Sequence, residues 1–95
     1  MTDIDVMIKS LVKQTQNAST PELMKKAPAY QELKAVGQTA VQPLLVALKD
    51  EDRGAMAIMT LLEDIVGENP AEAFAGDVMQ AAEAWITWGE DHNLL

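Results

Sequence analysis

Apolar residues recur three and four positions apart along most of this chain, which is the spacing of one face of an α-helix. In the first segment they stand at Ile4, Met7, Ile8, Leu11 and Val12. No segment of five or more residues alternates apolar with polar side chains as a half-buried β-strand does. The pattern therefore predicts an all-α fold, a compact bundle of five to six helices.

The length of 95 residues accommodates one domain, since autonomous domains rarely fall below about 50 residues. We expect residues 1–95 to form a single helical domain whose body spans residues 28–89. A run rich in Ser, Thr, Asn and Gln, residues 14–20, separates the N-terminal helix in residues 1–18 from that body. The apolar face of this helix is expected either on the body or on another chain, where it would support oligomerisation.

Capping patterns and glycines divide the chain into helices. Helix starts are predicted from Thr2, from Ser19 with Glu22, from Thr39 with Gln42, from Asn69 with Glu72 and from Asp77 with Gln80. A break is expected at Ala27 and Pro28, and Gly37 and Gly67 are placed to end helices.

The predicted helices differ in how much of their surface is apolar. The helix that ends near Lys49 has a buried stripe made of Val41, Leu44, Leu45 and Leu48. The helix over residues 53–66 is apolar except on the face that holds Thr60, Glu63 and Asp64, so we expect it at the centre of the bundle. The last long helix carries an apolar stripe of Val78, Ala81, Ala82, Trp85 and Trp88.

Two pairs of large side chains on these helices have two interpretations each. Trp85 and Trp88 could anchor a protein interface, but a small core with few aromatic residues needs their bulk, and core packing is favoured. Met56 and Met59 could form an adaptable apolar surface, although on so apolar a helix they are expected to fill gaps in the core.

Charge is distributed unevenly along the chain. The net charge is −8, and all seven basic residues lie in the first 53 positions, where seven acidic residues balance them. Residues 54–95 hold eight acidic residues and no lysine or arginine. Such a surface repels nucleic acids and anionic lipids and attracts basic proteins, so we expect neither direct nucleic-acid binding nor membrane binding. The simpler interpretation is that the acids only keep the protein soluble.

If the acids do bind a partner, those on the outer faces of the last two long helices and at the adjoining turn are the candidates. These are Asp50, Glu51, Asp52, Glu63, Asp64, Glu83, Glu90 and Asp91. The expected partner is a basic protein surface, such as that of a nucleic-acid-processing enzyme.

The sequence contains few residues and motifs that are typical of catalytic or ligand-binding sites. Cysteine is absent, His92 is the single histidine, and the sequence has no glycine-rich phosphate loop. Adjacent carboxylates such as Glu63 and Asp64 point about 100° apart on a helix and do not converge on a pocket unaided. The segment from Asp50 to Gly54 has its glycine at the wrong offset for a calcium loop. We therefore expect no enzyme activity, no catalytic residues, no cofactor and no metal site.

The longest apolar runs are five residues, whereas a membrane helix needs about 20. The first residues lack the positive and then apolar pattern of a secretory signal. Together with the absence of cysteine, these features favour a cytoplasmic location.

The stretch from Leu33 to Asp52 resembles a HEAT repeat in its glycine turn, its Ala-Val pair, its proline and the aspartate after its second helix. Residues 28–89 also resemble a group of small bacterial and phage proteins, mostly without assigned function. The similarity lies in Ile65-Val66-Gly67-Glu68-Asn69-Pro70 and in Trp85-Ile86-Thr87-Trp88-Gly89. The chain departs from that group at Arg53-Gly54-Ala55-Met56, where its members carry tryptophans.

The resemblance implies HEAT-like or armadillo-like antiparallel α-hairpins and an interaction role. A small acidic protein of this type fits an inhibitor, whether an immunity protein, an antitoxin or an anti-defence protein, that docks on a basic partner. The alternative is a structural helical adaptor or a homodimer, in which apolar surface makes the contact.

Overall fold

The structure is a computed structural model that describes residues 3–17, 20–50, 54–74 and 76–95. Its α-helices are α1 (Ile4–Gln14), α2 (Pro21–Lys25), α3 (Pro28–Val36), α4 (Val41–Asp50), α5 (Ala55–Val66) and α6 (Val78–Asp91). Two 3-10 helices, η1 (Gly37–Ala40) and η2 (Glu72–Phe74), lie between them. The described residues contain no strand, so the predicted all-α class is confirmed.

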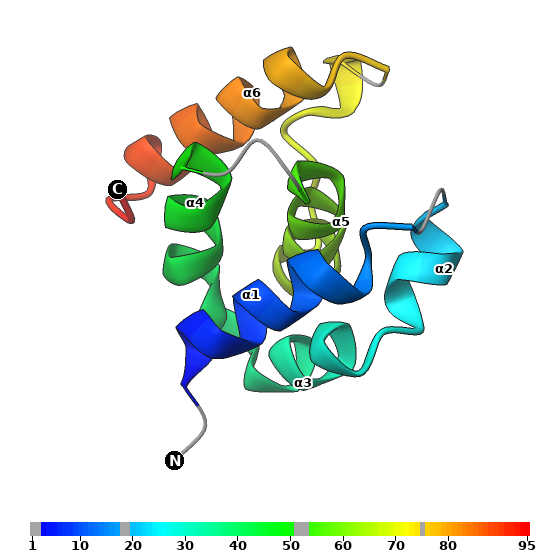
Figure 1. The fold of residues 1–95 in the computed structure, drawn as a ribbon. Coiled ribbons are helices and arrows are strands. Elements are labelled where there is room, and N and C mark those ends of the chain that lie inside the picture. The colour runs from blue at the N-terminus through cyan, green and yellow to red at the C-terminus, as the bar shows by residue number, and fades with distance from the viewer. Residues whose placement is uncertain (1–2, 18–19, 51–53, 75) are drawn as a thin grey trace.

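The helices form three levels around one core (Figure 1). Helices α1 and α3 pack against each other on one side of the molecule, and α4 and α5 pack side by side in the middle. Helix α6 lies across α4 and α5 on the side away from α3. The HEAT-like pairing of hairpins stays a prediction.

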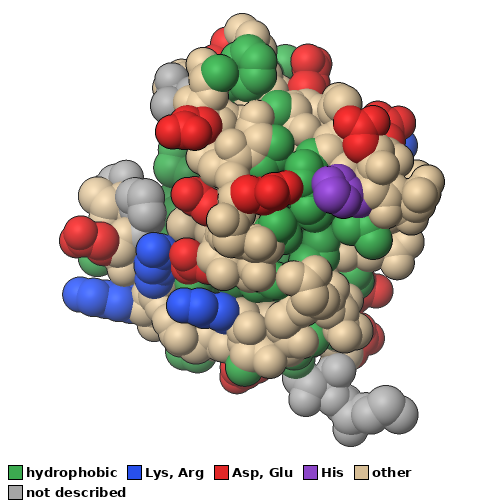
Figure 2. All heavy atoms as spheres, turned by 180° about the vertical axis from the view of Figure 1, so that it is seen from behind, with side chains coloured by type: hydrophobic (Ala, Val, Ile, Leu, Met, Phe, Trp, Pro, Cys, Tyr) green, Lys and Arg blue, Asp and Glu red, His purple; other side chains and the backbone are tan. Residues whose placement is uncertain are grey.

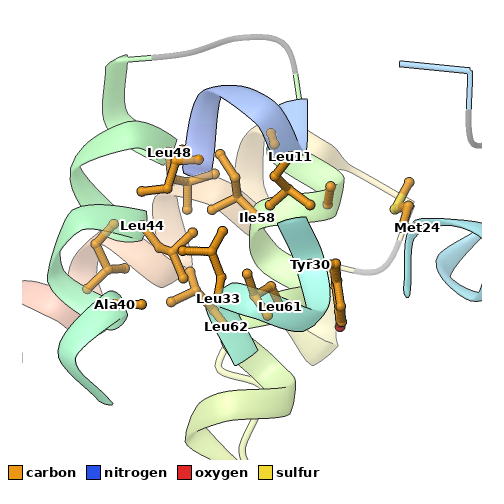
Figure 3. Packing of buried hydrophobic residues seen from close by; sticks show 14 of the residues in the cluster. Leu11, Met24, Tyr30, Leu33, Ala40, Leu44, Leu48, Ile58, Leu61 and Leu62 are labelled. Carbon is orange, nitrogen blue, oxygen red and sulfur yellow. The ribbon is translucent and has the colours of Figure 1, made fainter. Parts of the chain in front are cut away.

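The core lies between α1, α3, α4 and α5, and α6 adds Ala81 and Trp85 to it. Figure 3 shows Leu33, Leu44 and Ile58 converging from three of these helices. All four residues of the predicted stripe on α4 are buried, which confirms that stripe. Helix α5 also has the predicted central position, because it contacts each of the other five α-helices.

Several helix ends differ from the predicted ones. Asp3 caps α1 by accepting a hydrogen bond from the Asp5 N–H, and Thr20 caps α2 by accepting from the Leu23 N–H. The predicted caps Thr2 and Ser19 lie outside the described residues. In each case the predicted cap and the observed cap are neighbouring polar residues, and the capping pattern in the sequence is compatible with either of them.

The predicted cap at Thr39 is wrong. The chain passes from Gly37 directly into the 3-10 helix η1, which continues into α4 without an extended capping residue. Thr39 therefore lies inside a helical turn. By contrast, Gly67 ends α5 at φ +83° and Asp77 caps α6, both as predicted.

The first helix packs on the rest of its own chain. Met7, Ile8 and Leu11 are buried in the common core. The Gln14 side chain adds a polar link, because its Oε1 accepts a hydrogen bond of 3.1 Å from the Ala29 N–H at the start of α3. Helix α1 thus helps to fix the position of α3.

Helix α6 approaches α4 closely at Gly89. A Cβ atom on Gly89 would lie 2.8 Å from Leu45 Cδ1 and 3.0 Å from Leu95 Cδ1, so a larger residue there would have to displace these two leucine side chains. The chain then turns back, with Asn93 at φ +61° and with the Leu94 N–H bonded to the Gly89 carbonyl at 2.8 Å. This arrangement is a Schellman motif, which satisfies the last carbonyls of the helix.

Candidate protein-interaction surface

The candidate acids fall into three groups according to what the structure describes. Glu63 on α5 and Glu83, Glu90 and Asp91 on α6 are exposed. Asp64 on α5 is partly buried. Asp50 is the last residue of α4, and Glu51 and Asp52 lie outside the described residues.

Three further acids extend the same surface. Glu68 and Glu72 lie in the connection between α5 and α6, and Asp77 caps α6, and all three are exposed. These three acids belong to the eight acidic residues of 54–95, but they lie outside the helical faces from which the candidate acids were predicted. We call the surface formed by Glu63, Glu68, Glu72, Asp77, Glu83, Glu90 and Asp91 the acidic surface.

Few cations of this chain approach these acids. The one close ion pair among the described residues joins Lys25 Nζ to Asp64 Oδ1 at 3.7 Å. In Figure 2 the lysine side chains of one region gather at the lower left, while acidic side chains surround exposed apolar surface above and beside them. The acidic surface is therefore not neutralised by paired lysines in the part of the chain that is described.

Asp64 has a structural role that separates it from Glu63. The Tyr30 hydroxyl donates a hydrogen bond to the Asp64 carboxylate, which joins α3 to α5. Burial of the phenol, followed by the hydrogen bond to Asp64, raises the pKa of Tyr30 above its ordinary value. Glu63 lines the hollow between α5 and α6, which Asp64 does not, although the charge of Glu63 also contributes to the raised pKa of Tyr30.

The two tryptophans differ in their environment. Trp85 is 1% exposed, which confirms the core interpretation for this residue. Trp88 is partly buried, and its Nε1–H donates a hydrogen bond to the Glu68 carboxylate. The ring of Trp88 packs edge-on against the ring of Trp85, with 5.5 Å between their centroids. It also packs at a tilt against the ring of His92, with 4.2 Å between their centroids. This aromatic group ties the connection after α5 to the end of α6.

An apolar groove lies beside the acidic surface. It runs between α5 and α6, has a volume of about 290 Å³ and is also lined by Phe74 of η2. Its apolar lining includes Met56, Met59, Phe74, Val78 and Trp85. We call this hollow the α5–α6 groove.

Acidic and polar groups stand at the edge of the α5–α6 groove. Glu63 and Asp77 both line it. Asp77 Oδ1 accepts a hydrogen bond from the Gln80 N–H at 3.1 Å, and this bond lowers the pKa of Asp77. Asp77 therefore stays ionised well into the acidic range while it caps α6.

Helix α6 has a second hollow on its other side. This hollow has a volume of about 440 Å³ and shares Phe74 with the α5–α6 groove. Trp88, Glu83 and Asp91 are among its lining residues. Two of the three candidate acids of α6, Glu83 and Asp91, thus line this second hollow, whereas Glu63 lines the first.

The structure corrects the expectation for one of the two methionines of α5. Met59 is partly buried and packs on the core, as expected. Met56 is 45% exposed, because no described element covers this end of the groove. The interpretation as an adaptable apolar surface therefore applies to Met56.

Comparisons with protein-family models, with curated proteins and with solved structures find no match to this chain. Among the described residues, no group of three or more Asp, Glu or His side chains is placed to hold a metal ion. None of the described helices has the length and apolar character needed to cross a membrane.

Proposed function

We propose that this chain is an acidic protein-interaction module that docks on a basic protein surface. The observation that carries the proposal is the acidic surface itself. Its members are exposed, they come from α5, α6 and the connection between them, and no lysine or arginine occurs in residues 54–95. Charges arranged in this way accelerate the encounter with a positive partner and disfavour negative ones.

The class of partner follows from this chemistry. A basic groove that binds nucleic acid presents the lysines and arginines that an acidic surface of this kind would contact. Together with the resemblance to small bacterial and phage proteins, this supports an inhibitor that acts in the cytoplasm by occupying such a groove. The module needs no catalytic residue, metal or cofactor for that role.

The test is charge reversal with a matched control. The double variant Glu83→Lys with Glu90→Lys changes the charge of α6, and Glu22→Lys with Glu32→Lys makes the same change on the exposed parts of α2 and α3. Partners captured by the wild type from host lysate would be identified by mass spectrometry, and their association rates would be measured at low and high salt. We expect the α6 reversal to slow association by about tenfold or more, because steering contributes 10- to 1000-fold.

Two results would contradict the proposal. Equal effects of both reversals would show that the total charge matters and the acidic surface does not. Association that ignores salt and both reversals would favour the alternative, in which exposed apolar side chains such as Val6 and Leu23 mediate an adaptor contact or a homodimer.

The homodimer alternative is checked by sedimentation of the full chain at low and high salt. Removal of residues 1–18 is unsuitable, because Ile8 and Leu11 belong to the core. Val6→Lys is the better variant, since Val6 is 57% exposed on α1. A salt-independent dimer that this substitution dissociates would establish the alternative.

A further inference from the structure

Three of the exposed apolar side chains of this protein face the same hollow. Met56 is 45% exposed, Phe74 37% and Val78 40%, and all three line the α5–α6 groove. They come from α5, from η2 and from the first turn of α6. Isolated exposed apolar residues are ordinary, but several that converge from separate elements form a patch that typically marks an interaction site.

The floor of the groove is rigid and its walls are adaptable. Trp85 and Ala81 are buried beneath it, whereas Met56 and Met59 are unbranched side chains that change shape at low cost. The volume of about 290 Å³ lies at the lower end of small-molecule sites, which span about 300–1000 Å³. These dimensions suit a few inserted side chains better than an enclosed ligand.

The charges at the edge of the groove restrict which kind of partner segment can insert its side chains there. Glu63 and Asp77 are exposed and line the groove, and no lysine or arginine occurs in residues 54–95. A partner segment that places apolar side chains in the groove would set its flanking residues against these carboxylates. Lysine and arginine suit that position, because their long apolar stems pack on apolar surface while their charged ends reach the acids.

We propose that the α5–α6 groove binds an amphipathic basic helix of the partner protein. Leucine-like or phenylalanine-like side chains of one helical face enter between Met56, Phe74 and Val78. Lysines or arginines beside that face pair with Glu63 and Asp77. Helices that bind in grooves through residues spaced three and four apart commonly work in this manner. The inference rests on the proposed function and adds to it the segment that is recognised and the place where it binds.

The probe for the test is a synthetic helix of leucine and lysine, about 18 residues long, with leucine on one face. Two control peptides are used. One has the same composition in scrambled order, and the other has glutamate in place of lysine. Binding to the full chain is measured by calorimetry, and nuclear magnetic resonance shifts report which residues are contacted. We expect the amphipathic basic peptide to bind and to shift signals from α5, η2 and the start of α6.

Matched variants locate the binding. The groove variant is Met56→Gln with Val78→Thr, and its control is Leu23→Gln with Val46→Thr. The control side chains are 46% and 44% exposed and line neither hollow of α6. Both double variants keep the approximate size of the side chains and replace exposed ones, so we expect them to retain the fold. Circular dichroism checks this. We expect the groove variant to weaken binding by about tenfold or more, as loss of interface anchors does, and the control by less than about twofold.

The contribution of charge is tested separately. Glu63→Gln with Asp77→Asn removes the two carboxylates at the edge while asparagine keeps the cap of α6. We expect weaker binding and a shallower dependence on salt than for the wild type.

The outcomes separate this inference from the proposed function. The groove is excluded if the groove variant binds as tightly as the control variant, or if the scrambled peptide binds as well as the amphipathic one. In either case a salt-dependent effect of the α6 reversal on association would leave the proposed function standing. If no basic peptide binds, and if partner association also ignores charge reversal, then both fail.

Discussion

Tyr30 illustrates how one hydroxyl links two helices and makes their packing sensitive to pH. The ring of Tyr30 is fully buried, and its hydroxyl donates to Asp64, which Lys25 also approaches. Hydrogen bonds to charged groups contribute about 1.5–3 kcal/mol, and partial exposure of Asp64 reduces that value. We therefore expect Tyr30→Phe to lower the free energy of unfolding by about 1–2 kcal/mol at neutral pH, as measured by urea denaturation.

The sign of the pH dependence follows from the raised pKa of Tyr30. In the unfolded chain the phenol ionises near its ordinary pKa of about 10, whereas in the folded chain it stays protonated. The stabilisation is thus complete below about pH 10 and declines above it. The difference in stability between wild type and Tyr30→Phe should shrink as the pH rises past that value. A difference in stability that stays constant or grows as the pH rises would contradict the raised pKa of Tyr30.

At the scale of elements, Gly54 controls how closely α1 approaches the start of α5. Its backbone (φ +78°, ψ 5°) nearly matches that of Gly67 (φ +83°, ψ 9°) at the other end of the helix. A Cβ atom on Gly54 would lie 2.8 Å from Val12 Cγ2, whereas one on Gly67 meets nothing within 4 Å. The two positions therefore share the same backbone strain and differ in the contact with α1.

We expect Gly67→Ala to cost about 1–2 kcal/mol, since the left-handed conformation is unfavourable for alanine. Gly54→Ala should cost about 1–3 kcal/mol more, because the added methyl group overpacks the contact with Val12. Denaturation of both variants measures the difference. The double variant Gly54→Ala with Val12→Ala should recover part of the added loss, and equal losses for the two glycines would refute the contact.

The same elements show what the sequence predicts well. The stripe of α4 and the central position of α5 follow from helical spacing, because a helix has to bury the apolar face that it carries. Gly67 and Asp77 were predictable for a local reason, since each satisfies backbone groups of its own helix end.

Other features depend on contacts between distant parts of the chain. Tyr30 and Asp64 are 34 positions apart, and no local pattern pairs them. The exposure of Met56 depends on where α6 and η2 leave the side of α5 uncovered, so spacing on α5 alone favoured a buried methionine. The start of α4 was mistaken because a 3-10 turn replaces the predicted cap. The exposure of Glu63, Glu83, Glu90 and Asp91 was predictable, since polar faces of amphipathic helices point to solvent.

At the scale of the whole molecule, the unneutralised acids destabilise the fold at low ionic strength. The acidic surface concentrates like charges that repel one another, and salt screens them over about 10 Å at 0.1 M. We expect the melting temperature to rise by a few degrees between low and physiological salt. Glu83→Gln with Glu90→Gln should raise the melting temperature at low salt and weaken its salt dependence, as calorimetry would show.

Glu32→Gln is the control, because Glu32 lies on α3 in the part of the sequence where acids and bases balance. It should leave the salt dependence nearly unchanged. A melting temperature that falls as salt is added would mean that attractive pairs dominate, in conflict with the single close ion pair among the described residues.

The uneven distribution of negative charge over the molecule has a mechanical consequence. Exposed acids and exposed lysines occur together on and beside α1, α2 and α3, whereas the acidic surface on α5, α6 and their connection holds acids without lysine or arginine. The centre of the negative charge is therefore displaced toward α5 and α6, and a positively charged object exerts a torque on the protein before the two touch. If the partner is basic as proposed, we expect the protein to meet it with α6 foremost, so that fewer collisions are lost to wrong orientations.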